Sequence, residues 1–248
     1  MNQSMCVITK SIVSNPTESM QSVQINRSTL NFLKDLAAHN DREWFAEHKE
    51  TYTEAQQNMI DFVDALIVTM NTHDVLENES GKKSLFRIYN DVRFSKNKAP
   101  YKTRFAFSLQ RATKARRGGY YVNITPGGSF LACGFFGPNP EDLKRIRQDI
   151  DVNYEDWNTL LDSESIRTVF GELRGEQVAT SPKGYSKDHP AIGLLRHKQF
   201  IFRREFSDQE VLADDFSDRI SNSFQALRPW LDYMSQVLTT DLNGELVN

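Results

Sequence analysis

Residues 120–136 read YYVNITPGGSFLACGFF. Two apolar runs, 120–124 and 129–136, flank the short segment Pro126–Gly128. Glycine adopts the positive φ angles of tight turns and proline fixes its own φ, so this pattern predicts a β-hairpin. The turn also accounts for the paired glycines, and no phosphate-binding glycine loop is found elsewhere in the chain.

Further strands are expected on both sides of the hairpin. Residues 104–109 and 86–89 alternate between apolar and polar side chains, as strands with one buried face do. The alternation assigns Phe105 and Phe107 to the core rather than to a base-stacking surface. The segment 199–206 is also strand-like.

Helical patterns precede and follow these strands. Apolar residues recur at steps of three and four over 28–40 and 41–71, with Asp41 suited to cap the second helix. Pro140 is suited to the first position of a helix, and Ser207 with Glu210 matches a capping box. The expected fold class is therefore α+β, with a small, mostly antiparallel sheet packed against N-terminal and C-terminal helices.

The composition favours one intracellular domain. The 248 residues allow a sizeable core, and the two cysteines, Cys6 and Cys133, form no disulfide framework. We expect residues 1–26 to form a disordered polar tail and 27–248 a single domain in the cytoplasm. No apolar run spans a membrane, no cofactor is implied, and no cluster has the spacing of metal ligands.

Charge is unevenly distributed along the chain. The formal net charge is −3, yet the segment Lys82–Arg117 holds twelve Lys or Arg residues and one acid, Asp91. A smaller basic segment, Lys183–Arg204, holds six basic residues and one acid, Asp188. Crowding of like charges costs free energy that a bound anion relieves, so both segments are candidate binding sites.

Within the two basic segments, particular side chains are candidates for a site. The candidate anion-binding residues are Arg87, Arg93, Lys96, Lys98, Tyr101, Lys102, Lys183 and Arg196. Asp91 and His189 are the candidate catalytic residues, because a carboxylate and an imidazole exchange protons. Arginines near Asp91 lower the pKa of its carboxyl group, which favours a role in orienting them over a role as base. For the set as a whole, a structural network of ion pairs is an equal alternative.

Three spaced motifs resemble one known family. They are FLKDLAAHNDREWFAEHKETY at 32–52, RIYNDVRFSKNKAPYKTRF at 87–105 and KGYSKDHPAIGLLRHKQF at 183–200. Together they resemble the bacterial and fungal family DUF2461, over roughly 30–238, and the resemblance implies no established activity. The chain departs from the family pattern at Asn90, Asn97 and Ala99, where the pattern has Arg, Asp, and Ser or Thr.

Three functions remain open from the sequence. The first is a pocket, formed by both basic segments, for a small ligand that bears phosphate or carboxylate, with or without turnover. The second is nucleic-acid binding through residues 82–117, although the whole-chain pI near 6.0 lies below that of dedicated nucleic-acid domains. The third is a non-catalytic module that docks an acidic protein or a second copy, and the sequence sets no oligomeric state.

Overall fold

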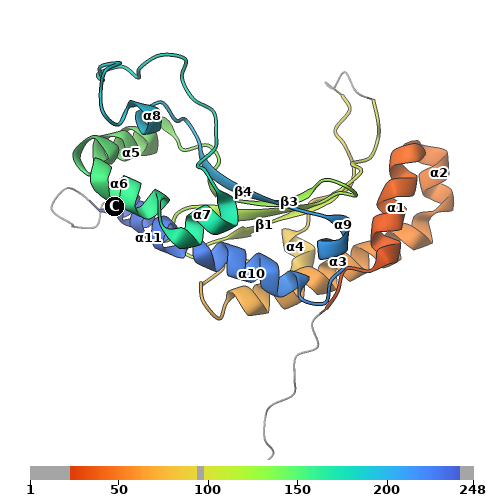
Figure 1. Cartoon of the computed structure of the whole chain (residues 1–248). Helices are drawn as coiled ribbons and strands as arrows, with labels where there is room; N and C mark the ends of the chain where they lie inside the picture. The colour runs from red at the N-terminus through yellow and green to blue at the C-terminus, as the bar shows by residue number, and fades with distance from the viewer. Residues whose placement is uncertain (1–22, 94–97, 241–248) are drawn as a thin grey trace, which may run out of the picture.

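The computed structural model describes residues 23–93 and 98–240, and Figure 1 shows how their helices and strands are arranged. The helices are α1 (Arg27–Ala38), α2 (Arg42–Glu47), α3 (Lys49–Met70), α4 (Gly81–Ser84), α5 (Pro140–Val152), α6 (Tyr154–Leu161), α7 (Glu164–Phe170), α8 (Ile192–Leu195), α9 (Asp208–Val211), α10 (Phe216–Ala226) and α11 (Arg228–Thr239). The strands are β1 (Phe105–Gln110), β2 (Gly119–Ile124), β3 (Ser129–Phe135) and β4 (Phe200–Phe206). The fold class is α+β, as the sequence predicts.

The four strands form one antiparallel sheet in the order β1-β2-β3-β4. The predicted hairpin is confirmed as β2 and β3, whose turn is closed by a hydrogen bond from Gly128 N to Thr125 O at 2.9 Å. The predicted strand at 86–89 is an extended segment beside β1, joined by bonds such as Phe86 N to Ala106 O at 2.8 Å. Residues 85–93 and 98–104 together form a two-stranded projection from the sheet, which we call the basic ribbon.

One face of the sheet carries the core. Phe105, Phe107 and the other inward-facing side chains of the strands are fully buried, which confirms their assignment. Aromatic pairs join this face to the C-terminal helices: the ring centroids of Tyr120 and Phe224 are 4.5 Å apart, and those of Phe202 and Trp230 are 5.2 Å apart. α3 packs against α10 and completes the helical layer.

The helix starts predicted from the local sequence are found in the structure, but two of the expected helices are interrupted. The Asp41 carboxylate accepts a hydrogen bond from Trp44 N, and Ser207 forms the full capping box. The single helix expected over 41–71 is divided at His48 into α2 and α3. The helix that opens at the capping box ends after four residues as α9, and α10 begins at Phe216.

The N-terminal tail expected over 1–26 lies outside the described residues as far as residue 22. The last part of it belongs to the packed structure, because Ile25 is only 2% exposed and Asn26 N donates to Asn58 Oδ1 at 2.8 Å. Packing against α3 therefore extends the ordered chain N-terminal to α1. Across the described ranges, no helix is both long and apolar enough to cross a membrane.

Candidate functional site

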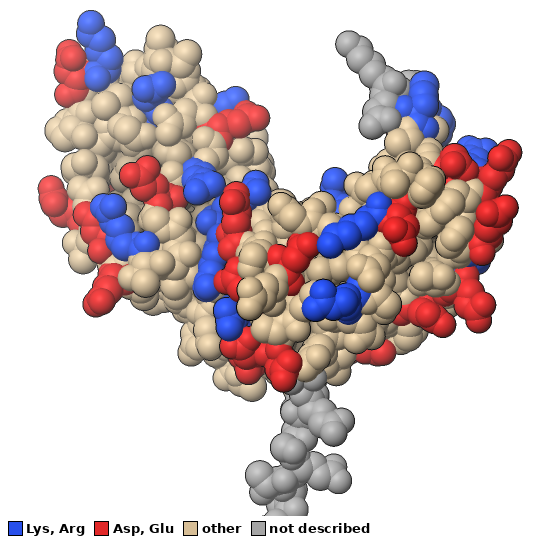
Figure 2. Space-filling view, turned by 45° about the vertical axis from the view of Figure 1, so that its right-hand side comes forward, with Lys and Arg blue, Asp and Glu red and all other residues tan. Residues whose placement is uncertain are grey.

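Among the described residues, no helix lies over the second face of the sheet. In Figure 1 the helical layer lies below the sheet, while α5 and α8 rise at one end and α1, α2 and the basic ribbon rise at the other. Figure 2 shows the resulting hollow as a notch between two lobes of the molecule. The outward-facing side chains of all four strands are therefore candidates for contact with a ligand.

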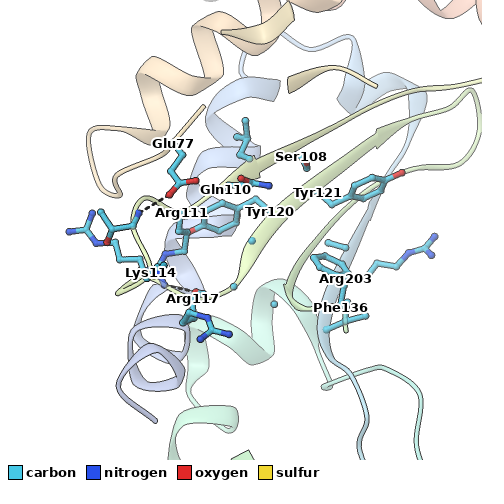
Figure 3. A pocket seen from close by; sticks show the side chains of 18 of the residues that line it. Glu77, Ser108, Gln110, Arg111, Lys114, Arg117, Tyr120, Tyr121, Phe136 and Arg203 are labelled. Carbon is cyan, nitrogen blue, oxygen red and sulfur yellow. Dashed lines mark hydrogen bonds between the residues drawn. The ribbon is translucent and has the colours of Figure 1, made fainter. Parts of the chain in front are cut away.

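A cavity of about 790 Å³ lies on this uncovered face. One row of the sheet register, Gln110, Gly119, Gly134 and Ile201, contributes to its floor. The two glycines carry no side chains, so backbone atoms form this part of the floor. Figure 3 shows side chains on both sides of this floor. Lys114, Arg117 and Glu77 lie on one side, and Tyr121, Phe136 and Arg203 lie on the other.

The basic side of this cavity is the loop 111–118, which joins β1 to β2. Its position is fixed by Arg111, whose Nη1 donates to the carbonyl oxygen of Arg117 at 3.1 Å. Arg117 N donates to Ser235 Oγ of α11 at 2.9 Å, and the Arg117 guanidinium pairs with Asp142 of α5. The loop is therefore tied to the helical layer at several points.

Arg111 is buried together with its carboxylate partner. Its Nε lies 2.8 Å from Asp74 Oδ2, and neither side chain is exposed. Arg111 also pairs with Asp232, and Arg228 bridges the same two carboxylates at 3.2 Å. Burial by itself raises the pKa of Asp74, but hydrogen bonds from Tyr120 and Val75 and the charge of Arg111 outweigh burial. The pKa of Asp74 is lowered as a result, which keeps the carboxylate ionised.

Two cations of the loop are available to a ligand. Lys114 and Arg116 both line the cavity, and within the described residues neither has a carboxylate within 4 Å. Glu77 is committed to the loop, since its Oε1 accepts a hydrogen bond from Thr113 N at 3.0 Å. Lys114 and Arg116 thus differ from Arg111, Arg117 and Arg203, the other cations at the cavity, each of which pairs with a carboxylate.

Three aromatic rings cross the uncovered face beside the cavity. The ring centroids of Phe86 and Tyr121 are 6.2 Å apart, and those of Tyr121 and Phe130 are 5.9 Å apart. The Arg203 guanidinium lies over the Phe130 ring at 3.8 Å from its centroid. We call Phe86, Tyr121 and Phe130 the aromatic stripe. Phe86 is 46% exposed, whereas Tyr121 and Phe130 are partly buried.

A second group of cations lies at the base of the basic ribbon. Arg87, Lys102 and Arg104, here called the cation triplet, have no carboxylate within 4 Å in the described ranges. The pKa of Lys102 is lowered, first by burial and then by the charges of Arg104 and Arg87. Lys102 also donates to the carbonyl oxygens of Arg87 and Tyr89, at 2.6 and 3.2 Å. An anion placed here would relieve the repulsion between the three cations.

The other predicted residues of the ribbon have partners within the protein. Arg93 binds Asp91 through two hydrogen bonds, at 2.9 and 2.6 Å, and this pairing lowers the pKa of Asp91. Lys98 Nζ donates to Val92 O at 3.0 Å. Tyr101 is buried and stacks on Phe45 at 3.9 Å between ring centroids.

Asp91 thus orients Arg93, as the sequence suggests, and Tyr101 anchors the ribbon to α2 instead of facing a ligand. Lys96 lies outside the described residues.

Residues 200–204 of the second basic segment belong to β4, while residues 183–198 lie at the opposite end of the sheet from the ribbon, beside α5 and α8 (Figure 1). There His189 Nε2 bonds to Asp151 Oδ1 at 2.8 Å, and His189 Nδ1 accepts from Ala191 N at 3.0 Å. Both ring nitrogens are therefore engaged within the protein. Arg196 Nε donates to Val178 O at 2.9 Å, and Lys183 is exposed on the loop before α8.

The pocket expected from the cations at 87–102 and at 183–196 is therefore not formed, although Arg203, near the end of the second basic segment, lines the cavity together with the loop 111–118. The ribbon packs on α1 and α2, whereas the segment 183–198 packs on α5 and on residues 176–178. The uncovered sheet face separates the two segments, so the cations of the ribbon lie far from those of residues 183–198. Lys183, Arg196 and His189 are accordingly not among the residues that we place at the cavity.

Sequence reasoning missed the aromatic stripe, the glycine floor and Arg203. The alternation in 120–136 contains the signal, since Tyr121 and Phe130 fall on the face opposite to the core. A half-exposed aromatic in a strand is common, however, and the missing information is that no helix covers this face.

Within residues 23–93 and 98–240, no three His, Cys, Asp or Glu side chains are grouped as metal ligands. Cys133 is buried in the core, and burial raises the pKa of its thiol well above the usual value.

Comparison with known proteins gives one result. No curated protein and no solved structure matches the chain significantly. The model of a family described as conserved hypothetical protein matches residues 28–233, which include the whole sheet, the basic ribbon and the loop 111–118. The chain therefore belongs to the family DUF2461.

Proposed function

We propose that the protein binds an anionic ligand that carries a flat ring, with phosphate or carboxylate as the anionic group, on the uncovered face of its sheet. The observation that carries this proposal is the 790 Å³ cavity, which combines a glycine floor, aromatic side chains and unpaired cations. Its volume falls within the range typical of small-molecule sites, of the order of 300–1,000 Å³.

The two sides of the cavity differ in chemistry, one aromatic and one cationic, as such a ligand requires. Tyr121 and Phe136 offer apolar surface against which a ring can pack, and Gly119 and Gly134 allow a close approach to the backbone. Lys114 and Arg116 lie on the opposite side, where they can donate charge-assisted hydrogen bonds to an anionic group. Because neither cation pairs with a carboxylate among the described residues, no such carboxylate competes with the anion for them.

Binding of 5′-AMP is the first test, because this probe joins a ring to a phosphate. We expect 5′-AMP to raise the melting temperature of the protein, and adenosine or inorganic phosphate alone to raise it less. Isothermal titration calorimetry at low salt then gives the affinity. If none of the three probes stabilises the protein at millimolar concentration, the proposal is wrong.

Variants of the loop locate the site. Arg116→Ala and Lys114→Ala are each expected to weaken 5′-AMP binding about tenfold, since a charge-assisted hydrogen bond contributes of the order of 1.5 kcal/mol. Lys82→Ala on α4 is the matched control, because it removes an exposed lysine from outside the cavity. Equal affinities for all three variants and the wild type would place the ligand elsewhere.

A further inference from the structure

We infer that the natural ligand is a single strand of nucleic acid that runs across the uncovered face from the cavity to the cation triplet. This inference rests on the proposed function and names its ligand class. It begins from the observation that the cavity does not end at the aromatic stripe. Tyr121 also lines a second hollow of about 150 Å³, whose other lining residues are Phe86, Lys102, Arg104 and Ala106.

The distance between the two cationic ends is too long for one nucleotide. Gln110 lines the cavity, and Arg104 of the triplet directly precedes β1, six residues away along the chain. At about 3.3 Å per residue this separation is about 20 Å. A ligand that contacts both ends must therefore be long, and it must carry negative charge at more than one point.

The surface between the two ends is aromatic. Neighbouring rings of the stripe have their centroids about 6 Å apart, and the guanidinium over Phe130 adds a fourth flat group. The Arg203 guanidinium is held both by the Phe130 ring and by an ion pair with Glu205, while its buried Nε has no hydrogen-bond partner among the described residues. Flat rings between basic ends match alternating bases and phosphates of a nucleic acid.

The geometry favours a single strand over a duplex. Bases in a duplex are stacked on one another and expose only their edges, so they cannot lie on protein rings. An unpaired strand exposes the faces of its bases, and every base has such a face. The expected binding is therefore tolerant of sequence and sensitive to salt, because the phosphates release counterions.

The charge of the whole chain does not prevent this binding. Screening at physiological ionic strength acts over about 8 Å, so the acidic residues on other surfaces have little effect at the uncovered face. Near the path, Glu77 is bound to the loop and Glu205 pairs with Arg203 at 3.2 Å. Neither carboxylate lies within 4 Å of Lys114, Arg116 or the cation triplet in the described ranges.

The test is fluorescence anisotropy with labelled single-stranded DNA of increasing length, from one nucleotide to about twelve. We expect the affinity to rise at least tenfold between one and about six nucleotides and then to level off. The affinity of the longer strands is expected to fall as salt rises, with a slope near −2 in a log–log plot for about three phosphates. A duplex of the same sequence is expected to bind at least tenfold more weakly.

Variants connect this binding to the stripe and the triplet. The double variant Tyr121→Ala/Phe130→Ala is expected to weaken binding of the long strand about 10- to 100-fold and binding of 5′-AMP less. Tyr89→Ala is the aromatic control, since Tyr89 is 49% exposed but contacts Phe45 and Tyr101 on the α2 side of the ribbon. Should the double variant unfold, the exposed Arg104→Ala supplies the same test, with a loss of about tenfold for the long strand only.

The outcomes separate the two proposals. Equal affinity for 5′-AMP and the long strands would leave the proposed function in place and overturn the inference. Equal binding of the duplex, or of an acidic polypeptide of similar charge, would also overturn it, because stacking would then contribute nothing. Failure of both 5′-AMP and the strands to bind would overturn both proposals.

Discussion

Replacing Asp74 with alanine is expected to lower the free energy of unfolding by about 3–5 kcal/mol. The side chain is fully buried and pairs with Arg111 at 2.8 Å and with Arg228 at 3.2 Å. Tyr120 Oη also donates to it at 2.6 Å. Its removal leaves Arg111 buried with only Asp232 as a charged partner, and a buried charge without full compensation is strongly destabilising.

Urea denaturation at neutral pH measures this effect. The control is Asp162→Ala, which breaks an Asp–Arg pair whose side chains are 60% and 53% exposed. For an exposed pair the expected loss is below about 1 kcal/mol. If Asp74→Ala fails to fold, Asp74→Asn tests the same charge with a side chain of nearly the same shape. Equal stability of the Asp74 and Asp162 variants would show that the buried network contributes little.

The same carboxylate predicts a pH dependence. The folded protein lowers the pKa of Asp74, so the stabilisation is present above the ordinary aspartate pKa of about 3.9. It is lost as the pH falls through the lower pKa of the folded state. The difference in stability between the wild type and Asp74→Asn is therefore expected to be constant from pH 7 to about 5 and to shrink below about pH 4. A difference that grows with acid would contradict this assignment.

This network also shows why the sequence predicts some parts of the molecule and not others. Asp41, Ser207 and Glu210 act on backbone amides three residues away, and their roles could be predicted from local spacing. Arg111 meets Asp74 and Asp232, which lie 37 and 121 residues away in the chain. Within a segment of twelve basic residues, no local signal distinguishes this buried arginine from exposed ones such as Arg104.

The residues of the candidate site likewise divide into those that the sequence predicts and those that it does not. The sequence locates the basic residues and the alternation of the strands, and Lys102 and Arg87 remain part of the proposed site. The expectation that the ribbon and the segment 183–198 meet in one pocket was wrong. The sequence does not show that the first packs on α1 and α2 and the second on α5. Tyr121 and Phe130 acquire their importance only from the absence of a helix above them, which is a property of the whole fold.

Substitution of Gly134 is the second change expected to have a large effect on stability. This residue packs against the neighbouring strand and also forms part of the floor of the cavity. Its φ is +127°, and a Cβ at this position would lie 2.1 Å from Phe200 O in β4. The clash is with backbone in the neighbouring strand, which cannot rotate away. Gly134→Ala is therefore expected to lower the free energy of unfolding by about 2–5 kcal/mol, from backbone strain and overpacking together.

Gly119→Ala is the matched control, since Gly119 is paired with Gly134 across β2 and β3. A Cβ there would meet only Leu109 O, at an ordinary contact distance of 3.6 Å. The free energy of unfolding of Gly119→Ala should differ from that of the wild type by less than about 1 kcal/mol, because alanine suits a strand at least as well as glycine does. The added methyl group would still narrow the floor of the cavity, so Gly119→Ala is expected to weaken 5′-AMP binding without unfolding the protein. Thermal unfolding of the two variants tests the expected stabilities, and calorimetry tests the expected loss of 5′-AMP binding. A Gly134→Ala protein as stable as the wild type would mean that β3 and β4 do not approach each other as closely as the structure shows.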